Sequence, residues 1–394
     1  MLVPNRALHE TGGTRLSSFL IALVALWFLV SAIYYVEFLF SGDILASRGD
    51  HLFHKMAKYL VVLSLSIALM LRSGCYLTII IYGMGLFSVS IIYLIFPDSQ
   101  WLIEALIVFL SMSGMALLLA NCSEEQRHTL VGAILLGAFL AGIMSFYEMH
   151  YLVDLYTPYW AQTGTIRSIS TLFNPNNFGL YMGAALILLA GYRASIALRV
   201  VFFVPIFYGF CMSGSRTAWV ALVVVLGFYC LTEVRRVNLK LVAVFGAGFF
   251  LLFCGGIYFI AVGEFYAPER MLNFDSALIR FERYFEFVQS FDVTYFLPDS
   301  EGARLGLVSE SAYFTLMNSM GLLGFACFLA FLVFIFKSRS SSEVDVSFKM
   351  VFVYYLVCAL FENTLNSFPN NQMFFVSMGV FFVFRESKEK KKRG

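Results

Sequence analysis

The chain of 394 residues is 60% hydrophobic and 18% aromatic, and 13% of its residues are charged. Soluble globular domains carry about 25% charged residues, so this composition excludes an ordinary soluble enzyme or binding module. The net charge of +2 excludes little, because the distribution of charge along the chain is more informative than the total.

Apolar runs of about 18 to 24 residues recur along the chain, each long enough to cross a bilayer, and twelve spans with soft edges are expected. They predict an all-α integral membrane protein that forms a single polytopic domain over residues 1–394, because a helix satisfies its own backbone hydrogen bonds in lipid. The first run is too long for the apolar segment of a cleaved signal peptide. The expected spans are residues 17–40, 54–71, 76–96, 101–120, 129–147, 176–192, 197–214, 217–232, 239–262, 310–336, 348–362 and 371–384.

Basic residues gather on one side of these spans. With the N-terminus in the cytoplasm, about two-thirds of the 27 Lys and Arg residues lie in inner segments, as the positive-inside rule requires. Both termini are then cytoplasmic, and the basic tail 388–393 is interpreted as an anchor on anionic lipid rather than a nucleic-acid site. The two long connections, residues 148–175 and 263–309, are then outer loops, where function is often carried.

The second outer loop contains an amphipathic stretch. Its apolar residues recur at alternating spacings of four and three, which predicts a helix with one apolar stripe: Phe274, Leu278, Phe281, Phe285 and Val288. We expect this helix to lie along the outer membrane–water interface and to hold Arg280 and Arg283 above the spans. A helix packed on the spans without a chemical role is the alternative.

The sequence lacks the motifs of several enzyme classes. It has no P-loop, no dinucleotide-binding glycine motif and no serine-hydrolase elbow, and its five histidines do not cluster as metal ligands. We therefore expect chemistry without a cofactor, and without a metal unless the substrate carries one. Glu37, Glu104 and Glu362 lie near the outer ends of spans and are candidates, because an ionisable group in a membrane is usually functional.

The first outer loop ends in an arginine and an Asn-Pro-Asn turn. Arg167 is the basic residue of this loop, and Asn174 and Asn176 flank the proline at the start of the sixth span. The turn itself explains the asparagines, since Asn176 or Asn177 can cap the helix that follows. It does not explain Arg167.

Three further pieces place charge on the same side of the membrane. Arg216 lies in the short hairpin 213–219, where a charge at the edge of the bilayer needs a partner or a ligand. Arg280 and Arg283 lie on the amphipathic stretch, and Glu310 begins the tenth span. Arginine binds phosphate oxygens in a bidentate manner, and a carboxylate can take a proton from an attacking hydroxyl. These roles fit the transfer of a group away from a lipid pyrophosphate, with Glu310 either as the base or as a partner of an arginine.

These stretches resemble the O-antigen polymerase and O-antigen ligase superfamily of bacterial inner membranes. The matching residues are 168–178, 213–219, Glu310–Tyr313 and Gly321–Gly324, and the resemblance is specific over residues 160–335. It implies a GT-C-like fold of about twelve helices with a large late periplasmic loop. It also implies metal-independent, inverting transfer of a glycan from undecaprenyl pyrophosphate, with the active site facing the periplasm. The implied pyrophosphate ligands are Arg216 and Arg280, and the other expected substrate-binding residues are Arg167, Asn174, Asn176, Arg283 and Tyr313.

The sequence favours the polymerase branch of this superfamily. Ligases end the large loop with a histidine, whereas Glu310 stands at that position here and no histidine follows residue 150. The expected function is O-antigen polymerisation in lipopolysaccharide biosynthesis, with membrane lipid and a chain-length regulator as further partners. A ligase that transfers the glycan to lipid A–core and a flippase for the lipid-linked glycan stay open as alternatives. A transporter is expected to carry an internal repeat and charges at mid-bilayer, but the charges here gather at the outer face.

Overall fold

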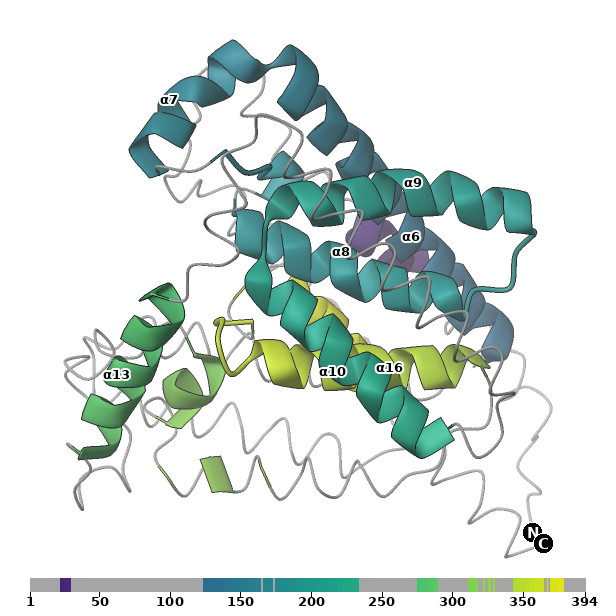
Figure 1. Cartoon of the computed structure of the whole chain (residues 1–394). Coiled ribbons are helices and arrows are strands. Elements are labelled where there is room, and N and C mark those ends of the chain that lie inside the picture. Colours follow the sequence, from purple (N-terminus) through teal and green to yellow (C-terminus); the bar gives the residue numbers. More distant parts are fainter. Residues whose placement is uncertain are drawn as a thin grey trace, which may run out of the picture.

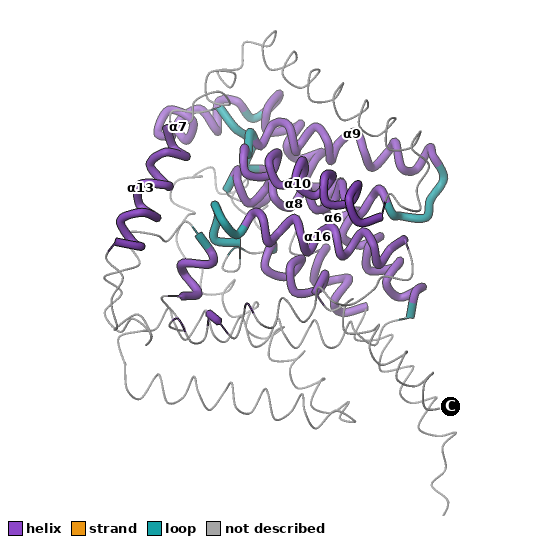
Figure 2. Tube along the Cα trace, turned by 60° about the horizontal axis from the view of Figure 1, so that its bottom comes forward, coloured by secondary structure: helices purple, strands orange, loops and turns teal. Residues whose placement is uncertain are grey.

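The computed structural model describes residues 22–29, 123–163, 166–172, 174–233, 275–289, 311–317, 322, 325–326, 329, 343–364, 367 and 369–378. All regular secondary structure within these residues is helical (Figures 1 and 2), so the prediction of an all-α fold is confirmed for this part of the chain. The expected spans 54–71, 76–96, 101–120 and 239–262 lie outside the described residues. The number of twelve spans and the GT-C-like arrangement therefore stay predictions.

Five long helices form the described bundle, and each coincides with an expected span whose ends are shifted by a few residues. They are α6 (Glu124–Tyr151), α8 (Pro175–Ala190), α9 (Ile196–Ser213), α10 (Arg216–Glu233) and α16 (Glu343–Cys358). Helix α9 packs on both α6 and α8, and α16 packs on α8 and α10 (Figure 1). Helix α8 therefore lies at the centre of the bundle.

Among the described helices, α6 and α9 are long and apolar enough to cross a membrane. The outer face of α9 is made of branched apolar side chains that are more than half exposed, such as Ile196, Val200 and Val204. Such a face is unusual for a soluble protein and suits contact with lipid tails. The length and composition of these two helices fit the membrane protein expected from the sequence.

Polar residues set the ends of these helices. Ser123 and Gln126 form a capping box at the start of α6, in which each side chain accepts a hydrogen bond from the backbone of the other. Ser195 caps α9 by accepting from the amide of Leu198. Helix α9 ends at Gly214, whose φ of 57° lies in the left-handed region that glycine adopts without strain. The chain can therefore reverse there and begin α10 at once.

A buried ion pair joins the start of α6 to the start of α16. Arg127 contacts Asp345, whose side chain is 1% exposed. Removing one member of such a pair leaves an uncompensated buried charge and costs about 3–5 kcal/mol. The pair therefore fixes these two helices at the end of the bundle opposite to the residues described below.

Helices α6 and α9 approach each other at a glycine. A Cβ atom added to Gly142 would lie 2.6 Å from the carbonyl carbon of Pro205, which is backbone and cannot move aside, whereas a Cβ added to Gly227 in α10 would meet nothing within 4 Å. We expect Gly142→Ala to lower the stability by about 1–3 kcal/mol through overpacking. Gly227→Ala should be neutral or stabilising by up to about 1 kcal/mol. Thermal unfolding of both variants in detergent is the measurement, and equal stabilities would show that the helices have room to separate.

The connection 148–175 contains a helix that was not predicted, α7 (Val153–Thr163), which follows the end of α6 (Figure 1). Its Tyr156 and Trp160 pack with Met149 and Ile169 in a small core separate from the main one. Burial raises the pKa of the Tyr156 phenol far above its ordinary value, so the group stays neutral. This part of the loop is thus an ordered support for the residues that follow it.

Candidate functional site

The candidate site lies at the end of the bundle where α8 and α10 begin and where α9 and α16 end. Arg216 is the first residue of α10, directly after the reversal at Gly214. The amide groups at the start of a helix carry partial positive charge and favour anions. Two helix starts and nearby arginines therefore give this end of the bundle a positive character.

Arg167 links the connection 148–175 to this end of the bundle. Its Nε donates to the carbonyl of Ser213 at 2.6 Å, and its Nη2 donates to Oδ1 of Asn176 at 2.6 Å. Trp160 of α7 donates from Nε1 to the Arg167 carbonyl at 3.1 Å. A Cβ atom on Gly214 would lie 3.3 Å from Nε of Arg167, so Arg167 can approach the hairpin this closely because residue 214 has no side chain. Arg167 thereby orients Asn176 and the hairpin before Arg216.

A fully buried carboxylate fixes the loop that follows Arg167. Glu148, near the end of α6, accepts hydrogen bonds from the hydroxyl of Ser168 at 2.6 Å and from the amides of Ile169 and Ser170 at 3.0 and 2.7 Å. Ser170 has a φ of 46°, which is strained for a residue with a side chain, and its hydroxyl donates to the Ala141 carbonyl at 2.6 Å. These bonds hold the loop in a conformation that its sequence would not adopt alone.

The cap of α8 is Asn174, so the prediction that Asn176 or Asn177 caps this helix is wrong. Oδ1 of Asn174 accepts from the amides of Asn176 and Asn177 at 2.8 and 3.2 Å. The proline that follows favours an extended conformation at Asn174, and it fills the first helical position, where no amide donor is needed. The side chain of Asn176 is therefore available for contacts with other segments.

Glu362 is the carboxylate on which these segments meet. Its Oε1 accepts from Nδ2 of Asn176 at 3.0 Å, from Oγ1 of Thr217 at 3.4 Å and from Nη2 of Arg280 at 3.4 Å. The residue lies in a turn after α16, where its amide donates to the Cys358 carbonyl at 2.9 Å, and its side chain is 14% exposed. One carboxylate thus accepts hydrogen bonds from residues of α8, α10 and the amphipathic helix.

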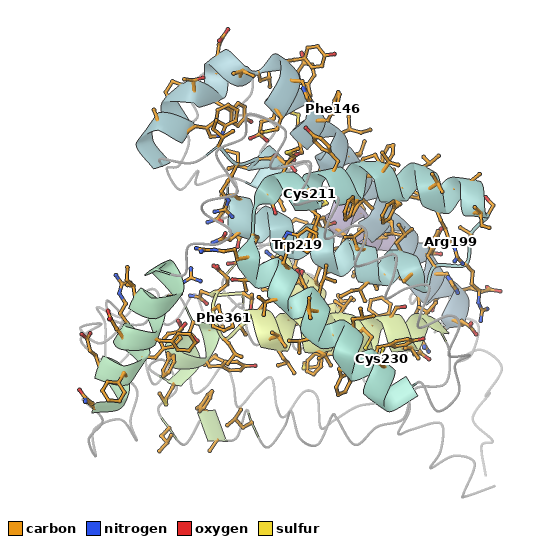
Figure 3. All side chains as sticks on the ribbon, in the orientation of Figure 1. Phe146, Arg199, Cys211, Trp219, Cys230 and Phe361 are labelled. Carbon is orange, nitrogen blue, oxygen red and sulfur yellow. The ribbon has the colours of Figure 1, made fainter. Side chains whose placement is uncertain are left out.

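The amphipathic helix is confirmed as α13 (Asp275–Gln289). Arg280 and Tyr284, one turn apart, face the rest of the protein: Arg280 pairs with Glu362, and the ring of Tyr284 stacks on Phe314 at 4.8 Å. Phe281 and Phe285 of the apolar stripe are 56% and 61% exposed. Figure 3 shows α13 across from the turn that carries Phe361, with side chains filling the space between. The helix therefore presents Arg280 to the site, and Phe281 and Phe285 outward.

The remaining predicted site residues have different positions. Arg216 is half-buried at the start of α10, and Arg283 is exposed on α13. The hydroxyl of Tyr313 donates to the Leu356 carbonyl of α16 at 2.8 Å, which gives this residue a structural contact. Glu310 lies outside the described residues, so its role in the reaction stays a prediction.

A second Pro-Asn-Asn turn belongs to the same end of the bundle. Residues 369–371 repeat the order of residues 175–177. The two turns touch, since Nδ2 of Asn370 donates to the Asn177 carbonyl at 3.1 Å, and Tyr355 of α16 donates to Oδ1 of Asn370 at 2.8 Å. Reasoning from the sequence did not assign residues 369–371 to the site. The repeat of Pro-Asn-Asn, shortly after Glu362 and before the last apolar run, was the signal in the sequence that could have indicated them.

The arrangement combines guanidinium groups for an anion, amide groups for hydroxyls and a carboxylate that can carry a proton. Within the part of the chain that the structure describes, no three His, Cys, Asp or Glu side chains come together as metal ligands. In comparisons with known proteins, no protein-family model matches the chain, and no curated protein shows significant similarity to it.

Proposed function

We propose that this protein is an O-antigen polymerase of a bacterial inner membrane. It transfers a growing glycan from undecaprenyl pyrophosphate onto a lipid-linked repeat unit at the periplasmic face. The observation that carries the proposal is the meeting of Arg280, Asn176 and Thr217 on Glu362, at the end of the bundle where α8 and α10 begin. Transfer from a donor with an anionic leaving group to an acceptor hydroxyl uses this combination of groups: positive charge for the leaving group and a carboxylate for the hydroxyl proton.

The arginines supply the binding of the leaving group. Arg216 and Arg280 hold the pyrophosphate, and the amide groups at the start of α10 add to their charge. Negative charge grows on the pyrophosphate as its bond to the sugar breaks, and fixed positive groups stabilise that charge more than the ground state. The bond to the pyrophosphate supplies the driving force, so the transfer needs no nucleotide.

The lipid nature of both substrates fits the outer surface of the chain. Helix α9 exposes branched apolar residues, and α13 exposes Phe281 and Phe285 beside the arginine that faces the site. An undecaprenyl tail can then stay in the bilayer while its pyrophosphate reaches the arginines at the interface. In this proposal both termini are cytoplasmic, the chemistry is metal-independent and inverting, and a separate chain-length regulator is a partner.

Deletion of the gene tests the proposal in cells. Electrophoresis of the lipopolysaccharide should then show core that carries one repeat unit, because attachment of single units persists without polymerisation. Core alone with long polymer on the lipid carrier would indicate a ligase instead. Core alone with repeat units trapped on the cytoplasmic side would indicate a flippase. A normal ladder would contradict all three functions for this glycan.

A further inference from the structure

We infer that Glu362 takes the proton from the acceptor hydroxyl, and that the adjacent Asn363 binds the acceptor sugar. The inference rests on the proposed function and adds a catalytic residue and an acceptor site to it.

Glu362 differs from Glu148 and Asp345, the two carboxylates that are buried among the described residues. Glu148 accepts three hydrogen bonds of 3.0 Å or less from a single loop, and Asp345 is paired with Arg127 in a nearly solvent-free position. Glu362 accepts instead from three separate segments, from Asn176 at 3.0 Å and from Thr217 and Arg280 at 3.4 Å, and its side chain is 14% exposed. A position where several segments meet, with access to water, suits a group that must gain and lose a proton in each cycle.

The residue after Glu362 carries an acceptor atom that needs a partner. Oδ1 of Asn363 is buried and has no hydrogen-bond partner among the described residues. A buried polar atom left in this state costs about 1–3 kcal/mol. Sugar hydroxyls are hydrogen-bond donors, and one that binds Oδ1 of Asn363 would place a neighbouring hydroxyl of the same sugar near Glu362. Under the proposed function, this sugar is the non-reducing end of the lipid-linked repeat unit.

The reaction step balances with these groups. The acceptor oxygen forms a bond to the anomeric carbon, and the bond between that carbon and the phosphate oxygen breaks. The electron pair leaves with the pyrophosphate, which Arg216 and Arg280 hold. The hydroxyl proton passes to the Glu362 carboxylate and then to water. In the structure without substrate, Glu362 pairs with Arg280, so the more highly charged pyrophosphate must compete with this carboxylate for the same guanidinium.

This competition gives a test that distinguishes a catalytic role of Glu362 from a role in positioning Arg280. The purified protein in nanodiscs is assayed for chain extension of an undecaprenyl-pyrophosphate-linked repeat unit and for equilibrium binding of the same lipid. Glu362→Gln should reduce the extension rate by about 10²-fold or more, as the loss of a general base does. Its Kd for the donor lipid should be unchanged or lower, because the competing charge is gone.

Two variants serve as references for Glu362→Gln. Glu282→Gln changes an exposed carboxylate on α13 and should leave both readouts as in the wild type. Glu310→Gln tests the other predicted base. If Glu362→Gln weakens donor binding in step with the rate, the carboxylate only positions Arg280 and the inference is wrong. It is equally wrong if Glu362→Gln extends chains normally while Glu310→Gln does not. A wild-type protein that binds the lipid but never extends it contradicts the proposed function itself.

The acceptor site is tested separately. Asn363→Ala should raise the KM for the acceptor repeat unit by about tenfold, the value of one hydrogen bond to a buried group, and should leave the Kd for the donor unchanged. An unchanged KM would remove Asn363 from the acceptor site.

Discussion

Arg216→Ala and Arg280→Ala should each abolish the O-antigen ladder in cells while the amount of protein in the membrane stays the same. Arg280 reaches the site from α13, and Arg216 begins α10 after the Gly214 reversal, so the two supply charge from separate segments. The loss of one preorganised donor to a developing charge costs about 10²- to 10³-fold in rate. Electrophoresis of lipopolysaccharide and immunoblotting of the membrane fraction are the measurements.

Two variants control for charge alone. Arg193→Ala removes an exposed arginine that pairs with Glu124 at the far end of α6, and it should leave the ladder intact. Arg280→Lys keeps the charge but loses the bidentate fork, so it should retain a short ladder. A full ladder from both alanine variants would contradict the role of these arginines in binding pyrophosphate.

Glu148→Ala should be among the most destabilising changes in the described part of the chain. It leaves the Ser168 hydroxyl and the amides of Ile169 and Ser170 buried without their acceptor, at a cost of about 3–5 kcal/mol. The loop would then lose the conformation that positions Arg167. Thermal unfolding in detergent, followed by size-exclusion chromatography, measures the effect.

Glu124→Ala is the matched control for this prediction. It lies on the same helix, in an exposed pair with Arg193, and should cost less than about 1 kcal/mol. Glu148→Gln should lie between the two, because one amide oxygen can still accept while the amide nitrogen faces a donor. Equal stabilities for Glu148→Ala and Glu124→Ala would show that the loop is held by other contacts.

The helices could be predicted from the sequence because their signals are local. Apolar runs of the required length mark α6, α8, α9, α10 and α16, and a repeating apolar spacing marks α13. Helix α7 was missed because it is short and mixed in character, and its apolar residues Tyr156 and Trp160 pack on a small separate core. Its position depends on tertiary contacts rather than on a periodic pattern.

The candidate site could be predicted only in part, because its contacts join residues that are far apart in the sequence. Asn176 and Glu362 are separated by 186 residues, and Arg280 and Glu362 by 82. From the sequence, Glu362 was one of three comparable carboxylates near span ends. No local pattern indicates that Arg167 would be joined to Asn176, or that the carboxylate of Glu148 would fold the intervening loop. The arginines were recognisable as residue types, whereas the partner of Arg280 required the structure.

The separation of Asn176 and Glu362 in the sequence also determines the order in which the parts of the site are made during synthesis of the protein. Helices enter a membrane as the ribosome makes them, from the N-terminus onward. Asn176 and the hairpin before Arg216 are therefore in place long before α16 and the turn after it have been made. The contact between α8 and Glu362 can form only after α16 has been inserted. A nascent chain that still occupies the translocation machinery consequently lacks the completed site. Under the proposed function, glycan transfer then begins only on a chain whose late helices have joined the bundle.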